Sequence, residues 1–181
     1  MKAVIERTNR LLNFPLKPGP RGLLLSAALL LLGAYFLPLW KVTTFGPEGV
    51  RLGTYSYELA ESEVRSTGFD PSNDVTGQRE VPTDFDEFGW LPFALGVVGL
   101  LFLRAVVLGT IGMLVDVSVV FVYLAVFSFW SIESRFSRYG QSDPGAGAYV
   151  LAAVAFALAA ALVIAWRQAR SEVAGEVRMA G

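Results

Sequence analysis

An almost wholly apolar stretch of 41 residues, 90–130, sets the strongest limit on what this chain can fold into. A bilayer hydrocarbon core about 30 Å thick is crossed by about 20 helical residues, each of which rises about 1.5 Å. The stretch is therefore too long for one crossing and long enough for two, joined by a tight turn at Gly109, Thr110 and Gly112. It predicts a helical hairpin in a membrane.

The same stretch holds two charged residues, Arg104 and Asp116, each six positions from Thr110. In an antiparallel hairpin these positions lie at about the same depth, so we expect a facing intramembrane charge pair. An unpaired charge at the centre of a transmembrane helix costs about 2.5–3.5 kcal/mol on insertion scales. Two interpretations are open: a structural pair, in which arginine can also snorkel to the interface, or one step of a proton or ion path. We favour the structural pair, because the apolar spans before and after this hairpin contain no ionisable group.

Hydropathy predicts four crossings, at 22–39, 90–108, 113–130 and 146–166. The first looks like a signal peptide, but no small-x-small cleavage site follows it, so we expect it to be retained. With 54% hydrophobic residues and a mean hydropathy of +0.50, the chain is more apolar than soluble domains of this size. The expected fold class is an all-α membrane protein, a four-helix transmembrane bundle.

The segments outside these spans differ in pattern. Residues 1–21 are basic and are either an amphipathic helix on the membrane surface or a disordered tail. In the loop 40–89, alternating residues on either side of a Gly-Pro-Glu-Gly turn predict a β-hairpin, whereas 61–80 resembles loop. The second loop, 131–145, and the tail, 167–181, are polar. We therefore expect a small β-rich cap on the bundle, contributed by the loop 40–89.

The distribution of charge predicts the orientation of the chain. Residues 1–21 carry a net charge of +4 and the tail +1, whereas the loop 40–89 carries −6. Basic flanks stay on the cytoplasmic side, so both termini are expected inside a cell inner membrane and both loops outside. Trp40, Trp90 and Trp130 then fall at the outer interface and Trp166 at the inner one, as aromatic belts do.

Composition excludes several kinds of chemistry. The chain has no Cys and no His, and its Met residues are not clustered, so no ordinary ligand set for haem, copper or zinc is present. Neither a Ser-His nor a Cys-His nucleophile can form, and no Gly-rich phosphate loop follows a predicted strand. A net charge of −1 gives no signal for nucleic acid. We predict a protein without a catalytic set and without a cofactor.

Two features predict contact surfaces. Ala153, Ala157, Ala161 and Ala165 form a stripe of small residues in the last crossing. Such a stripe lets helices approach closely, either within the bundle or against another subunit. In the outer loop, Tyr55, Tyr57, Phe69 and Phe85 are candidate anchors for a partner, because aromatic residues dominate interface hot spots; they could equally pack the loop onto the bundle.

Several short motifs occur at the predicted membrane boundaries: FLPLW at 36–40, PEGV at 47–50, DFDEF at 84–88, WLPFALG at 90–96, VDVS at 115–118, and YG at 139–140 followed by DP at 143–144. In these the chain resembles a family of small four-helix bacterial membrane proteins found beside nitrous-oxide-reductase maturation and copper-handling genes. The candidate histidine ligands of that family are absent here, where Gln141 and Ser142 follow Tyr-Gly. The resemblance implies the architecture and no metal site.

These features together predict a non-catalytic accessory subunit or assembly factor of a larger bacterial membrane complex, respiratory, denitrifying or photosynthetic. Its partners would be the lipid bilayer and other membrane subunits. The alternative is a small-molecule or ion carrier that uses Arg104 and Asp116. That alternative predicts a polar cavity between the two helices of the hairpin.

Overall fold

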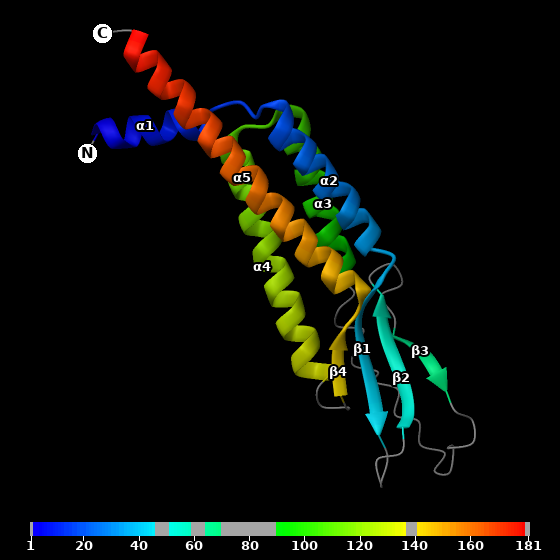
Figure 1. Ribbon diagram of the computed structural model, residues 1–181. Coiled ribbons are helices and arrows are strands. Elements are labelled where there is room, and N and C mark those ends of the chain that lie inside the picture. Colours follow the sequence, from blue (N-terminus) through cyan, green and yellow to red (C-terminus); the bar gives the residue numbers. More distant parts are fainter. Residues whose placement is uncertain (1, 46–50, 59–63, 70–89, 137–140, 180–181) are drawn as a thin grey trace. The chain divides into compact units, whose positions relative to one another are not determined.

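The computed structural model describes residues 2–45, 51–58, 64–69, 90–136 and 141–179, and it is mostly helical with one small sheet (Figure 1). The described helices are α1 (Lys2–Leu12), α2 (Pro18–Ala34), α3 (Trp90–Leu108), α4 (Ile111–Phe136) and α5 (Ala146–Met179). The described strands are β1 (Pro38–Phe45), β2 (Arg51–Glu58), β3 (Val64–Phe69) and β4 (Gln141–Pro144).

The chain divides into two compact units. The helical unit comprises Met1–Leu30, Val97–Tyr123 and Ala153–Gly181, and the sheet unit comprises Leu31–Gly96 and Leu124–Ala152. Each unit has a hydrophobic core of its own, and each is described by itself below.

The core of the helical unit is built from one face of each long helix. Apolar residues recur there three and four positions apart, which is the spacing of a single helical face. Phe102 of α3 and Phe121 of α4 are both fully buried, and their rings meet edge to face with centroids 6.1 Å apart. The core also contains Leu24, Ala27, Val98, Ala105, Leu114, Val117, Val154, Leu158, Ala161, Ala165 and Ala169.

The turn between α3 and α4 is set by local chemistry. Gly109 follows the last residue of α3, and a Cβ atom on it would lie 1.9 Å from the carbonyl oxygen of Ala105, so only glycine fits. Thr110 then caps α4: its Oγ1 accepts a hydrogen bond from the backbone N–H of Met113 at 3.4 Å. A threonine in this position satisfies one of the free N–H groups at a helix start. The two helices and the tight turn predicted around Thr110 are thus present in the structure.

The N-terminal segment is attached to this turn by two backbone hydrogen bonds. The N–H of Leu16 donates to the carbonyl oxygen of Gly109 at 2.9 Å, and the N–H of Ile111 donates to that of Phe14 at 3.0 Å. Leu11 and Leu16 are buried on either side of this short bridge. We call these contacts the N-terminal clamp. Of the two alternatives for the N-terminal residues, the structure has the helix, α1, and the clamp directly follows its last turn.

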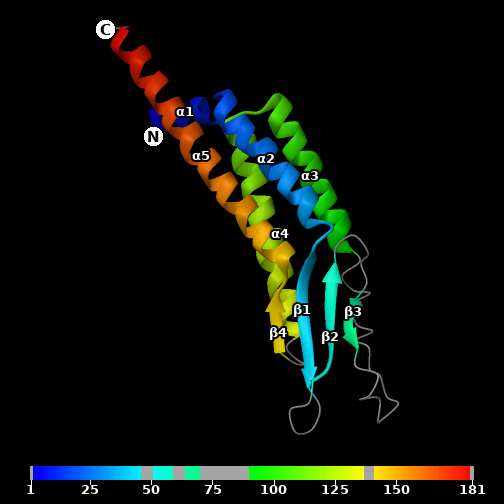
Figure 2. The same ribbon diagram turned by 45° about the vertical axis from the view of Figure 1, so that its right-hand side comes forward.

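The sheet unit contains an antiparallel sheet of four strands in the order β3-β2-β1-β4 (Figure 2). β1 and β2 form the predicted hairpin, with Trp40 opposite Tyr57 and Val42 opposite Tyr55. On its other edge β1 pairs with β4, which comes from the second loop, about a hundred residues later in the chain. The connecting turn between β1 and β2 lies outside the described residues.

The buried face of the sheet packs against helix ends of the same unit. Trp40 is almost fully buried and its ring lies 5.7 Å from that of Phe129 of α4, between centroids. Tyr57, beside Trp40 in the register, is 0% exposed. Further members of this core are Leu31, Ala34, Leu39, Val42, Leu91, Leu95, Ile132, Ala148 and Leu151.

Several of the predicted boundaries differ from the structure. The first predicted crossing is helix α2, which ends at Ala34 rather than at residue 39. Pro38 cannot continue a helix and begins β1 instead. Residues 64–69 and 141–144, expected to be loop, are strands β3 and β4. The tail, expected to be frayed, continues α5 to Met179. Its Ala, Arg, Gln and Glu residues are all good helix formers.

Two of the helical segments are long and apolar enough to cross a membrane, Ile111–Ser134 and Ala146–Val173. The helices Pro18–Ala34 and Phe93–Leu108 are apolar but shorter. This finding rests on length and composition, and it is compatible with the membrane location that the sequence predicts.

The junction of β4 and α5 yields a testable prediction. A Cβ atom on Gly145 would lie 2.1 Å from the carbonyl oxygen of Pro38, so Gly145→Ala must displace β1. We expect the free energy of unfolding to fall by about 1–3 kcal/mol, as for other overpacked sites. The measurement is the thermal unfolding midpoint in detergent, followed by circular dichroism.

Gly33→Ala is the matched control for this experiment. Gly33 belongs to α2 in the same unit, and a Cβ atom on it would meet nothing within 4 Å. This variant should unfold at or slightly above the wild-type midpoint, because alanine favours a helix. Equal midpoints for the two variants would contradict the steric explanation.

Candidate functional site

The strongest candidate site is a small pocket on the hairpin of the helical unit. Arg104 of α3 and Asp116 of α4 both line it, together with Leu101, Ala105, Met113, Val117 and Val120. Its volume is about 190 Å³. The two helices thus bring the two predicted charges to one place, at similar distances from the turn at Thr110. We call this the charge pocket.

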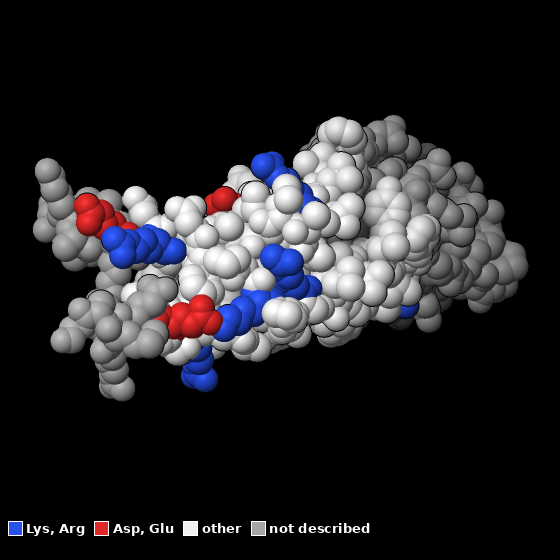
Figure 3. All heavy atoms as spheres, turned by 90° about the horizontal axis from the view of Figure 1, so that it is seen from above, with Lys and Arg blue, Asp and Glu red and all other residues white. Residues whose placement is uncertain are grey.

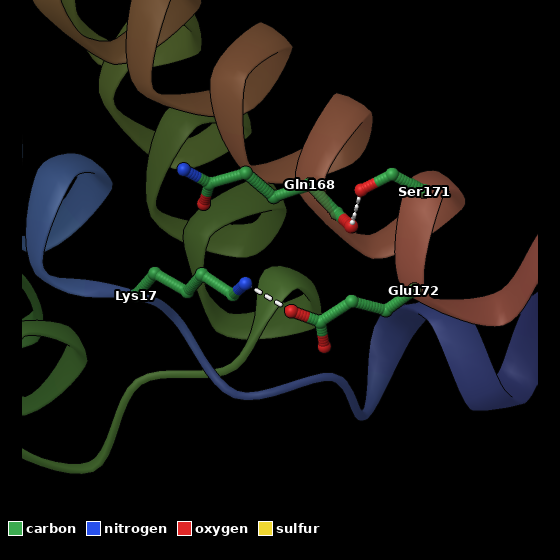
Figure 4. A network of polar contacts seen from close by, with 4 residues as sticks. All are labelled: Lys17, Gln168, Ser171 and Glu172. Carbon is green, nitrogen blue, oxygen red and sulfur yellow. Dashed lines mark hydrogen bonds and ion pairs between the residues drawn. The ribbon is translucent and has the colours of Figure 1, made fainter. Parts of the chain in front are cut away.

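Arg104 and Asp116 do not touch each other. Both side chains are exposed, and within the described residues neither makes an ion pair within 4.0 Å or a hydrogen bond. An ion pair that the structure does contain is that of Lys17 with Glu172, in the same unit (Figure 4). The direct contact that we expected between Arg104 and Asp116 is therefore absent, and the two side chains line the same pocket instead.

The surface around the charge pocket is apolar. On α3 the large side chains of Leu100, Leu103 and Val107 are exposed, and on α4 that of Val119 is exposed. The buried Ser118 of α4 is satisfied within the helix, because its hydroxyl donates to the carbonyl oxygen of Leu114 at 2.7 Å. Among the residues that the structure describes, Arg104 and Asp116 are thus charged groups without partners, with exposed apolar side chains around them.

The N-terminal clamp fixes the position of the charge pocket along the helices. Because it bonds the backbone on both sides of Thr110, α3 and α4 cannot slide past each other without breaking the two hydrogen bonds. A further close contact, in which a Cβ atom on Gly112 would lie 3.2 Å from the Leu12 carbonyl oxygen, limits movement on the α4 side. The two charges therefore stay level with each other along the hairpin.

The alanine stripe is divided between two environments. Ala161 and Ala165 are buried, Ala157 is half-buried and Ala153 is exposed. The reason is geometric: four residues turn a helix by about 400°, so a strict four-residue repeat drifts by about 40° at each step. The buried face of α5 instead follows Leu151, Val154, Leu158, Ala161 and Ala165, at alternating spacings of three and four. Only the later half of the stripe packs inside the unit.

The aromatic anchors predicted in the outer loop have different outcomes. Tyr57 is fully buried, so it belongs to the core of the sheet unit and is not available for contact with a partner. Tyr55 and Phe69 lie on β2 and β3, but their side chains are outside the described residues. Phe85 lies wholly outside them. Of the four, packing onto the rest of the protein is thus established for Tyr57 alone.

Two features of the helical unit were not predicted from the sequence. One is the ion pair of Lys17 with Glu172, whose partners are 155 positions apart and carry no local signal (Figure 4). The other is a groove along α5 lined by Leu162, Val163, Trp166, Arg167 and Arg170, with a volume of about 380 Å³. Its signal was present in the sequence as two arginines three positions apart directly after Trp166.

No group of three or more His, Cys, Asp or Glu side chains that could hold a metal ion occurs among the described residues. No known family model matches the chain, and no curated protein is significantly similar to it.

The buried Tyr57 yields a prediction on the pH dependence of stability. Burial, and secondarily the neighbouring Tyr35, raise the pKa of Tyr57 from 10.0 to about 12. Between these two values the unfolded chain has released a proton that the folded chain keeps, so stability must fall as the pH rises from 10 to 12. Below pH 10 this contribution is fully present. The loss should be on the order of 2 kcal/mol, at about 1.4 kcal/mol for each unit of pKa.

Tyr57→Phe removes the titrating group and keeps the ring. The unfolding midpoint of the variant should fall less steeply with pH between 10 and 12 than that of the wild type, in detergent at constant ionic strength. Identical slopes for the two proteins would show that Tyr57 ionises in the folded state as readily as in the unfolded chain.

Proposed function

We propose that this protein is a four-helix integral membrane protein whose helices α2, α3, α4 and α5 each cross the bilayer. Their outward faces support this proposal. Large exposed apolar side chains occur on all four helices, for example Leu29, Leu100, Val126 and Phe156. Monomeric soluble proteins rarely expose contiguous apolar patches larger than a few hundred Å². In a bilayer the same surface needs no further cover.

Backbone contacts support the number of crossings. The N-terminal clamp puts residues 14–16 on the same side as the turn at 109–111, and the pairing of β1 with β4 puts residues 40–43 on the same side as 141–144. If α4 crosses the bilayer, the turn before it and the strand β4 after it lie on opposite sides of the bilayer, and so do the segments paired with them. The segments that connect them, α2 and α3, must then cross as well, although each is shorter than α4.

The fourth crossing follows by the same reasoning. Lys17 follows the clamp and pairs with Glu172 at the far end of α5, whereas β4 directly precedes α5 (Figure 4). The two ends of α5 therefore lie on opposite sides once α4 crosses. Both termini then share one side, which the basic flanks assign to the cytoplasm.

Within this membrane protein we assign the role of a non-catalytic accessory subunit or assembly factor of a larger complex. The observation that carries this assignment is the charge pocket. Two opposite charges that have no partner among the described residues, on a face that would contact lipid, are stabilised when a partner helix brings complementary polar groups. Their cost without partners, about 2.5–3.5 kcal/mol each at a helix centre, is comparable to the coupling that an interface gains from a good ion pair.

The experiment is purification of the native protein in mild detergent, with mass spectrometry of every co-purifying polypeptide. A membrane partner in stoichiometric amount supports the assignment and identifies the complex. Recovery of the chain alone, or as a homo-oligomer, contradicts it.

A carrier is the second candidate, because both charges line one pocket between α3 and α4, as that function requires. The pocket is small and five of its seven lining residues are apolar. A carrier of protons would acidify or alkalise liposomes under a membrane potential, which a pH-sensitive dye detects. No flux above that of empty liposomes would exclude proton transport by this route.

The charge pocket yields a sharper prediction for the accessory role. Arg104→Gln and Asp116→Asn should each leave the free energy of unfolding unchanged within about 0.5 kcal/mol. Both side chains are exposed, and neither has a partner among the described residues. Each should reduce recovery of the partner severalfold.

Leu100→Ala is the control, since Leu100 is exposed on α3 near the pocket and has no charge. It should retain the partner. If either charge variant fails to fold, the charges contribute to folding of the chain itself, and the role of the pocket as a subunit contact is contradicted.

A further inference from the structure

The groove on α5 lies where that helix changes from apolar to polar. Its lining residues, Leu162, Val163, Trp166, Arg167 and Arg170, follow one another at spacings that place them on one helical face. The end formed by Leu162 and Val163 is apolar, and the end formed by Arg167 and Arg170 is cationic. Between them Trp166 is partly exposed. Tryptophan at such a boundary is typical of the membrane interface.

Neither arginine in the groove has a partner in the part of the chain that the structure describes. Both side chains are exposed. The nearest acidic residue in the sequence, Glu172, is already paired with Lys17. Figure 3, which looks down on the molecule from above, shows Lys and Arg side chains on this face, with Asp or Glu side chains beside some of them. The groove therefore carries a positive charge that no described residue neutralises.

We propose that this groove binds the headgroup of an anionic phospholipid. Its chemistry has two parts, and a phospholipid has the same two in the same order. Arginine presents a planar set of N–H donors that suits phosphate oxygens. The exposed Val163 and the half-buried Leu162, one turn deeper, would contact the first carbons of an acyl chain. A free phosphate would use the arginines and leave the apolar end of the groove bare.

The position of the groove fits this occupant. Basic pockets at the cytoplasmic ends of membrane helices are known sites for anionic headgroups. The groove volume, about 380 Å³, lies within the range of small-molecule sites. The bound lipid would hold the end of α5 at a fixed depth in the cytoplasmic leaflet. This role is independent of the charge pocket.

The test is native mass spectrometry of the full chain in detergent, titrated with phosphatidylglycerol or phosphatidylcholine. The wild type should bind phosphatidylglycerol the more tightly. Each arginine near an anionic lipid surface contributes about fivefold in affinity, so Arg167→Gln with Arg170→Gln should weaken phosphatidylglycerol binding by about 25-fold. Phosphatidylcholine binding should not change. Equal affinity of the wild type for the two lipids would overturn the proposal.

Lys41→Gln is the control for lost charge, because Lys41 is exposed on β1 in the other unit. It should bind phosphatidylglycerol as the wild type does, and an equal loss in this variant would overturn the site. A second arm adds glycerol 3-phosphate as a soluble competitor. If it displaced the lipid at equal molar concentration, the apolar end of the groove would have no part in binding, and the site would be one for phosphate rather than for lipid.

Discussion

Two backbone pairings between distant segments limit the paths that this chain can follow. One joins the residues before α2 to the turn between α3 and α4, and the other joins β1 to β4. Backbone hydrogen bonds are directional and need their groups within about 3 Å, so each pairing holds its two segments next to each other. Each also closes a long loop, whose entropic cost is recovered only because the buried Leu16 and Trp40 pack beside it.

The helices between these pairings have apolar side chains on both faces. Inward-facing residues such as Phe102 and Leu158 form the cores, and outward-facing residues such as Leu100 and Phe156 are exposed. A helix of this kind is not driven to pack by the hydrophobic effect once it is in lipid, because lipid is as apolar as the core. Specificity must then come from shape. The edge-to-face pair of Phe102 and Phe121, and the close approaches at Gly109 and Gly145, supply it.

Much of this structure could be predicted from the sequence, and the reasons for the rest are physical. Hydropathy and turn chemistry placed α3 and the hairpin at Thr110, because these depend on neighbouring residues. Strand β4 could not be found, since Gln141–Pro144 has no alternation of its own and becomes a strand only by pairing with β1. The buried state of Tyr57 likewise depends on tertiary packing. That Arg104 and Asp116 line one pocket followed from counting residues from the turn, whereas the lack of direct contact between them depends on side-chain placement that no count provides.

The place of β1 in the sheet has a consequence for biosynthesis. One edge of β1 pairs at once with β2, which follows it directly, but its other edge waits for β4. At typical rates of synthesis, the roughly one hundred intervening residues take on the order of 5–20 s to be made. During that interval β1 presents a row of unpaired N–H and C=O groups, the kind of edge to which foreign strands add. Completion of the sheet therefore has to wait until α3, α4 and β4 have been synthesised.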